Sequence, residues 1–154
     1  MDGVQFDDVE GLNARAGELG SWSAPMAVTQ EMIDRFADLT GDHQWIHVDV
    51  ERSRRESPFG GPVAHGFLTL SLIPHLLPKE RPMVTGHRNA VNYGSDKLRF
   101  VAPVPAGSQV RVRSRLLGAE AKPKGTLVTR EIEVEIVDAQ RPALVYAMQT
   151  LYMG

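Results

Sequence analysis

The sequence predicts an α+β fold in which an antiparallel sheet wraps around one long buried helix. Two observations support this class. Several stretches of the C-terminal half alternate between apolar and polar residues, as strands with one buried face do. Residues 66–77 are apolar on nearly every side, which is expected of a helix that is buried on every side. Packing the sheet against this helix would bury the apolar surfaces of both.

The C-terminal half contains a predicted hairpin. "VRVRSRL" (110–116) and "REIEVEIV" (130–137) each direct apolar residues to one face and charged residues to the other, and the turn-like "KPKG" lies between them. Placing Arg113 opposite Glu133 aligns the charges of the two strands, and such pairs fix the register and add a few tenths to about 1 kcal/mol each. The aligned pairs would be Arg111–Glu135, Arg113–Glu133 and Arg115–Glu131. Further strand-like segments are residues 89–94, 96–104 and 143–153.

The N-terminal half carries a helical pattern. A short strand is predicted at residues 26–28, followed by a helix from Thr29, a favourable N-cap, to Gly41, which can end a helix. Residues 50–57, "VERSRRES", are expected to form one or two solvated helical turns. The apolar face of the first helix consists of Met32, Ile33, Phe36 and Leu39.

The long apolar helix begins at Gly66, after a break rich in proline and glycine at residues 58–62. Pro74 removes one hydrogen bond inside this helix and should kink or shorten its last turn. An antiparallel sheet wrapped around one apolar helix is the hot-dog fold, and the order of the predicted elements fits it. We expect a single domain over residues 1–154, of which residues 1–16 would form a loosely ordered extension.

The composition excludes several classes of protein. The 154 residues carry a formal net charge of -2, so no overall field attracts nucleic acid. Cysteine is absent, which excludes a disulfide scaffold, a thiolate nucleophile and zinc bound by cysteine. The acidic N-terminus does not resemble a signal peptide, and no apolar run is long enough to span a membrane. We therefore expect a cytoplasmic protein with no nucleic-acid or membrane partner.

The stretch "TGDHQWIHVD" (40–49) contains the candidate acid–base groups. Asp42 and His47 are five positions apart, with the apolar pair Trp45 and Ile46 between them. This pair would shelter the two polar groups from water, or would simply pack a loop into the core. On their own, Asp42 reads as a turn residue and His47 as a buried structural histidine. A zinc site on His43 and His47 would need a third ligand.

Three motifs together resemble the MaoC-like dehydratases, the family of (R)-specific enoyl-CoA hydratases. In chain order they are "FADLTGDHQWIH", "FGGPVAHGF" and "NYGSDKLRFVAPVPAGSQVRV". The residues of "GDHQWIHVD" and "NYG" are most similar to the nodulation-protein-N-type branch of the family. The resemblance runs from about Gly17 to the C-terminus. It implies a hot-dog fold, a homodimer, and reversible addition of water to trans-2-enoyl-CoA, giving the (3R)-hydroxyacyl-CoA without a metal or other cofactor.

The resemblance also implies roles for individual residues. Asp42 and His47 match the catalytic pair, and Gly66 matches the residue whose backbone N–H holds the thioester oxygen. His65 would lie beside that amide as a structural side chain, while Asn92 and Tyr93 would line the acyl tunnel by analogy. The chemistry fits these residue types, because hydration needs a base for water at C3, an acid for C2 and N–H donors for an enolate-like oxygen.

Other functions remain open at this stage. The same fold serves acyl-CoA thioesterases, and the chain could also be a non-catalytic acyl-CoA-binding subunit or a dehydratase acting on acyl carrier protein. Arg54 and Arg55, in a run of arginines, fit either a solvated face or a contact with phosphate groups. One departure is Pro74, where relatives often carry a hydroxyl group that Thr69 or Ser71 would have to replace.

Overall fold

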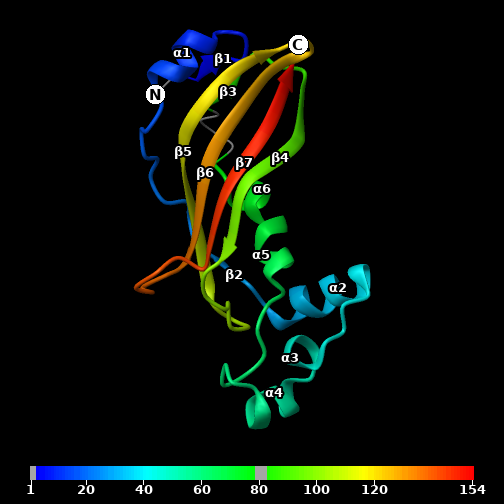
Figure 1. The fold of residues 1–154 in the computed structure, drawn as a ribbon. Helices are drawn as coiled ribbons and strands as arrows, with labels where there is room; N and C mark the ends of the chain where they lie inside the picture. Colours follow the sequence, from blue (N-terminus) through cyan, green and yellow to red (C-terminus); the bar gives the residue numbers. More distant parts are fainter. Residues whose placement is uncertain (1–2, 79–82) are drawn as a thin grey trace.

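A five-stranded antiparallel sheet forms the body of the computed structural model, which describes residues 3–78 and 83–154. The strand order is β2-β5-β6-β7-β4, so β2 and β4 are the two edges (Figure 1). Two very short strands, β1 and β3, pair in parallel and form a separate sheet. The strands are β1 (Val4–Gln5), β2 (Met26–Ala27), β3 (Val84–Thr85), β4 (Asn89–Phe100), β5 (Gln109–Lys122), β6 (Gly125–Ile136) and β7 (Leu144–Met153).

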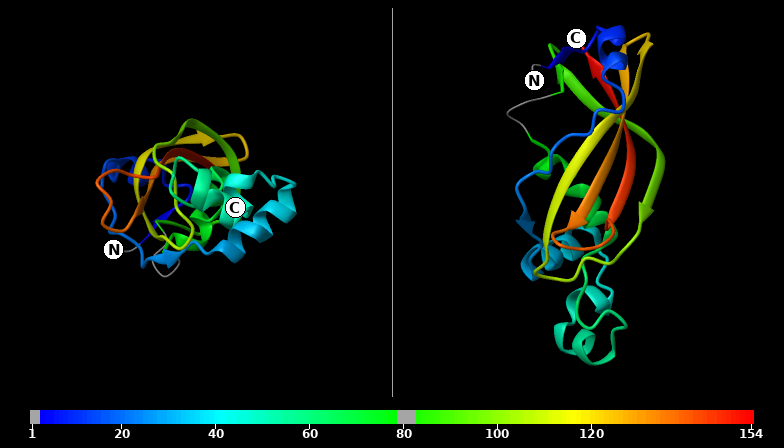
Figure 2. Two further views of the ribbon diagram at one scale, coloured as in Figure 1. Left: turned by 90° about the horizontal axis from the view of Figure 1, so that it is seen from below. Right: turned by 90° about the vertical axis from the view of Figure 1, so that its left-hand side faces the viewer.

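The sheet curves around the helical segment that follows Gly66 (Figure 2). The predicted single long helix is wrong in its continuity, since the segment consists of α5 (Gly66–Ser71) and α6 (Ile73–Leu76), joined at Leu72. Pro74 explains the break, because proline is tolerated in the first turn of α6 but not inside a longer helix. Burial on every side is also wrong for the isolated chain, since Phe67 is 63% exposed.

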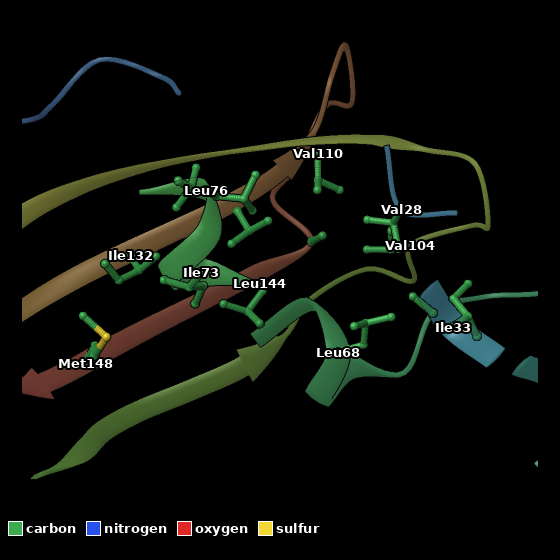
Figure 3. Close-up of a cluster of buried hydrophobic side chains, with 14 residues drawn as sticks. Val28, Ile33, Leu68, Ile73, Leu76, Val104, Val110, Ile132, Leu144 and Met148 are labelled. Atoms are coloured by element: carbon green, nitrogen blue, oxygen red, sulfur yellow. The ribbon is translucent and has the colours of Figure 1, made fainter. Parts of the chain in front are cut away.

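The main core lies between this helical segment and the sheet. Leu68 of α5 and Ile73 and Leu76 of α6 point toward side chains of β6 and β7, including Ile132 and Leu144 (Figure 3). Four of these five side chains are at least 95% buried, and burying a side chain of this size contributes about 1.5–3 kcal/mol. The helix therefore stays fixed relative to the sheet, and with it the loop that precedes Gly66.

The β5–β6 hairpin has the register that the sequence predicts. Arg113 pairs with Glu133, and the guanidinium and carboxylate lie 2.8 Å apart. Arg111–Glu135 and Arg115–Glu131 form the ion pairs on either side. Val110, Val112, Ile132 and Val134 of the same strands are fully buried on the opposite face, so the charged pairs and the core specify one register together.

The N-terminal segment packs on the far end of the sheet. Its helix α1 (Val9–Ala14) places Leu12 in a second buried cluster with Leu116, Val128 and Tyr152. The side-chain amide of Asn13 exchanges two hydrogen bonds of 2.8 Å with the backbone of Ala119. The structure thus differs from the loosely ordered extension expected for residues 1–16, since residues 3–16 are attached to the sheet by burial and hydrogen bonds.

Three helices form a lobe beyond the other end of the sheet (Figure 1). Helix α2 (Gln30–Thr40) begins at the predicted N-cap, Thr29, and ends at Gly41, whose φ of 78° is left-handed. Ile33 faces the core as predicted, whereas Leu39 is 82% exposed. The other two helices are α3 (Trp45–Val48) and α4 (Val50–Glu56). None of the helices in the described ranges is long and apolar enough to cross a membrane.

Candidate active site

The end of helix α2 positions Asp42. Gly41 turns the chain out of the helix in a conformation that few side chains adopt, and Asp42 follows it directly. One carboxylate oxygen of Asp42 accepts a hydrogen bond of 3.3 Å from the Gln44 N–H, which orients the side chain across the turn. Asp42 is exposed in the single chain, so the expected shelter by Trp45 and Ile46 is not provided by this chain alone.

Helix α3, a single turn, carries His47 into the interior. The ring is only 7% exposed, and Nδ1–H donates a hydrogen bond of 2.6 Å to the carbonyl of Val63. A carbonyl can only accept, so this bond assigns the proton to Nδ1 and leaves Nε2 with a free lone pair. Burial lowers the pKa of His47 below its ordinary value of 6.5, against a smaller opposing effect of the Val63 hydrogen bond. At neutral pH His47 is therefore an uncharged imidazole that can accept a proton.

His65 completes a cluster with the predicted pair. It precedes α5, is 3% exposed, and its Nε2–H donates a hydrogen bond of 2.9 Å to the backbone carbonyl of Asp42. Its ring stacks on the His47 ring with centroids 3.9 Å apart and an interplanar angle of 26°. A carboxylate oxygen of Asp42 and one ring nitrogen of each histidine all lie within 4.8 Å of one another.

This cluster has the composition of a metal site but a geometry that favours acid–base chemistry. A metal ion must lie near the plane of each imidazole that binds it, whereas two stacked rings present their nitrogens side by side. Nδ1 of His47 and Nε2 of His65 already donate to backbone carbonyls, and the remaining nitrogen of His65, Nδ1, is buried. His43 is not part of the cluster, because its exposed ring pairs with Asp38 at 2.8 Å. The alternative of zinc held by His43 and His47 therefore has no geometric support.

Gly66 lies beside the cluster, at the start of α5. No acceptor for its N–H is found among the residues that the structure describes, as is usual for the first amide of a helix. A Cβ atom at position 66 would lie 2.9 Å from the ring of Phe100, so any residue other than glycine requires this ring to shift. The sequence predicts Gly66 from its motif, but the covering ring of Phe100 is visible only in the structure.

An apolar cavity of about 220 Å³ adjoins Gly66. Its wall includes Phe59, Thr69, Phe100 and Leu144. Of the two hydroxyl residues considered as replacements at Pro74, Thr69 is buried and lines this cavity, whereas the exposed Ser71 donates its O–H to the Phe67 carbonyl. Thr69 is thus the hydroxyl residue of this pair that can face a ligand.

A larger open cavity of about 480 Å³ lies on the other side of Phe59. Gln30, Arg54 and the backbone of Gly60 and Gly61 are among its lining. The side-chain amide of Gln30 donates a hydrogen bond of 2.7 Å to the backbone carbonyl of His47, which connects the wall of this cavity to the candidate base. Sequence reasoning missed Gln30, since no motif marks a contact made across the fold.

The structure places Asn92 and Tyr93 away from the cluster. Both are exposed on β4, an edge strand, and neither lines the two cavities described above. The proposed acyl-tunnel role of these two residues is therefore not supported within one chain, and it stays a prediction for an assembly in which β4 is covered.

Comparisons with known proteins find relatives that cover most of the chain. The family model described as "MaoC like domain" matches residues 14–137. The chain is 48% identical over 141 residues to 3-hydroxyacyl-thioester dehydratase Z of Mycobacterium tuberculosis, covering 91% of this chain and 92% of the relative. It is also 48% identical over 128 residues to nodulation protein N of Rhizobium leguminosarum, covering 82% and 79%.

Among solved structures, the R-hydratase PhaJ1 of Pseudomonas aeruginosa superimposes with a TM-score of 0.69 at 22% identity. The match covers 90% of this chain and 81% of that chain. At this level of identity the likeness shows the fold, and it confirms the hot-dog architecture predicted from the sequence.

Proposed function

Because the chain belongs to the MaoC-like dehydratase family, we propose that it is an (R)-specific enoyl-CoA hydratase. In this reaction water adds to trans-2-enoyl-CoA: hydroxyl joins C3, a proton joins C2, and the product is the (3R)-hydroxyacyl-CoA. The reverse reaction removes water from the hydroxyacyl thioester. The observation that carries the proposal is the buried, neutral His47, which keeps a free lone pair on Nε2 and whose ring lies in one cluster with the carboxylate of Asp42.

The cluster supplies the groups that the reaction needs. His47 Nε2 accepts a proton from water as the oxygen attacks C3, because the Val63 carbonyl already holds the other ring proton. Asp42 holds the same water and is the second group through which a proton can reach C2. Attack at C3 moves charge to the thioester oxygen, and the free N–H of Gly66 stabilises that charge. The proton that His47 removes from the water then passes to C2 by way of Asp42, so the hydroxyl and the proton both come from one water and both residues end in their starting states.

The two cavities suggest how the substrate lies. The apolar cavity beside Gly66 is suited to the acyl chain, and Thr69 adds one hydroxyl to its wall. The larger open cavity is suited to the carrier part of the thioester, and Arg54 on its wall is placed to meet a phosphate group. Coenzyme A and acyl carrier protein both end in a phosphopantetheine arm, so competition between the two carriers decides which one is used.

We propose that the active form is a homodimer joined along β4. This edge strand is exposed along nearly its whole length, and unpaired edges are normally covered in native proteins. Exposed apolar side chains gather on β4 and the adjacent α5, namely Phe67, Val91, Tyr93 and Phe100. A partner on this surface would also bring Tyr93 and Asn92 under cover. Sedimentation should report twice the 17.0 kDa chain mass, and a fully active monomer would contradict the interface.

The hydratase proposal is tested by direct assay of purified protein on a series of trans-2-enoyl-CoA substrates. We expect the conjugated enoyl absorbance to be lost without release of free coenzyme A. Chiral analysis should identify the (3R) product. Release of coenzyme A as the main product would indicate a thioesterase, and a (3S) product would contradict the assignment. Binding without turnover would indicate a non-catalytic subunit, and a strong preference for acyl carrier protein would indicate the other dehydratase class.

A further inference from the structure

We infer that His65 is a positioning residue that holds Asp42 and His47 in their working arrangement. This inference rests on the proposed function, and it assigns His65 a role beyond its place next to the Gly66 amide. His65 contacts both members of the pair at once. Its Nε2–H donates a hydrogen bond of 2.9 Å to the Asp42 carbonyl, and its ring stacks on the His47 ring with centroids 3.9 Å apart. The structure offers no comparable bridge elsewhere in the cluster.

Burial fixes the form of the His65 ring. Its Nδ1 is inaccessible and has no hydrogen-bond partner, and the Nε2 bond to a carbonyl requires a proton on Nε2. A proton on Nδ1 as well would leave a buried donor without an acceptor, which is more costly than an unused lone pair. Because solvent does not reach Nδ1, the ring does not contact the reacting water through that atom. His65 therefore acts through its neighbours.

The contact with His65 ties the loop that holds the Asp42 carbonyl to α5, whereas the other hydrogen bonds of this loop are local and stay within residues 37–47. Residues 41–44 lie between α2 and α3, outside any helix or strand. Within the described residues, the His65 ring is the donor to the Asp42 carbonyl, and no second donor is found. His65 itself is fixed on its other side by the Phe36 ring, with centroids 5.1 Å apart. Catalytic geometry is sensitive to such support, since a shift of about 1 Å can reduce the rate roughly a hundredfold.

The stacked ring of His65 also covers His47. Burial is the main cause of the lowered pKa of His47, and His65 covers one face of that ring. Removing the aromatic cover while keeping the donor should let water reach His47 and raise its pKa toward 6.5. Removing the donor while keeping the cover should raise this pKa less, because only the smaller electrostatic effect of His65 is lost, but it should free the Asp42 loop. The two functions of His65 can therefore be separated.

Two variants make the separation. His65→Gln keeps an N–H donor for the Asp42 carbonyl but lacks the ring, whereas His65→Phe keeps the ring but lacks the donor. We expect His65→Phe to lose roughly tenfold to a hundredfold in kcat, with KM unchanged and with a smaller shift of the acidic limb of the kcat/KM profile than in His65→Gln. His65→Gln should move the acidic limb to higher pH. His75→Gln is the matched control, because the exposed His75 lies on α6 outside the cluster, and kcat and the acidic limb should stay at their wild-type values.

Titration of the His47 ring by NMR gives a readout that does not depend on activity. The pKa of His47 should rise more in His65→Gln, which loses the aromatic cover, than in His65→Phe, which loses only the smaller electrostatic effect of His65. Phe36→Leu, which loosens His65 without altering either catalytic residue, should lower kcat to a lesser extent and serves if a His65 variant does not fold. Wild-type kcat in His65→Phe together with an unchanged His47 titration in His65→Gln would overturn the inference. If wild-type protein lacks hydratase activity, the proposed function fails. The titration of His47 in the His65 variants then remains as the test of whether His65 covers His47.

Discussion

If Asp42 and His47 act on one water, the two residues should lose activity as a unit. The test uses Asp42→Asn and His47→Gln, alone and combined, because these changes preserve size and much hydrogen bonding but remove proton transfer. Each single variant should lose about 10² to 10⁴ in kcat, the range for a positioned acid or base. That loss corresponds to about 3–5 kcal/mol of transition-state stabilisation.

The structure predicts small effects of these changes on stability. Asp42 is exposed, and asparagine keeps the oxygen that accepts from the Gln44 N–H. His47→Gln puts at risk one buried hydrogen bond to the Val63 carbonyl, which is about 1 kcal/mol of unfolding free energy. Activity should therefore fall by far more than stability does, and a variant that melts only slightly earlier should still be nearly inactive.

The assay is the initial rate of loss of enoyl absorbance, with the melting temperature measured on the same samples. Independent losses would multiply in the double variant to about 10⁴–10⁸, whereas residues that act as one unit leave the double variant scarcely worse than the poorer single variant. The reasoning would be refuted by variants that melt early yet hydrate enoyl-CoA at the normal rate. In that case Asp42 and His47 only support the loop.

Three further predictions concern pH, the glycine at α5 and the hairpin. The pKa of His47 is below 6.5 in the folded chain, so the unfolded chain binds more protons at pH values between the folded pKa and 6.5. The contribution of His47 to stability is therefore complete above pH 6.5 and is lost as pH falls through the folded pKa. The free energy of unfolding and kcat/KM should both decline on that acidic side when they are measured against pH. His47→Gln should lack this part of the change in stability. Gly66→Ala forces the Phe100 ring aside from a 2.9 Å approach, so we expect a destabilisation of about 1–3 kcal/mol and a lower kcat/KM; unchanged kinetics would mean that the approach is not needed. Glu133→Gln removes the partly exposed pair with Arg113, and urea unfolding should show a loss of about 0.2–1 kcal/mol with unchanged turnover.

The sequence by itself determined the features that depend on neighbouring residues. The caps Thr29 and Gly41 set the ends of α2, because they satisfy or terminate the backbone hydrogen bonds of the helix they flank. The register of β5 and β6 followed from a period of two with complementary charges such as Arg113 and Glu133. The motifs also identified Asp42 and His47, which the fold brings together as expected.

The helix after Gly66 shows where local pattern was insufficient. Its apolar residues predicted a helix buried on every side, yet Phe67 is exposed in the single chain. Apolar periodicity states which residues avoid water but not which surface covers them. The division into α5 and α6 was partly visible in Pro74, but the sequence does not show how far the second helix continues beyond it.

How the proposed catalytic pair is held could be learned only from the tertiary structure. The Val63 carbonyl that assigns the proton of His47 lies 16 residues away in the chain, and the Asp42 carbonyl that His65 binds lies 23 residues away. Such contacts form because the buried face of α5 fixes the preceding loop against α2 and α3, and no local preference encodes that distance. Residue types therefore predicted which groups take part, while packing determined their protonation, their burial and their orientation toward one another.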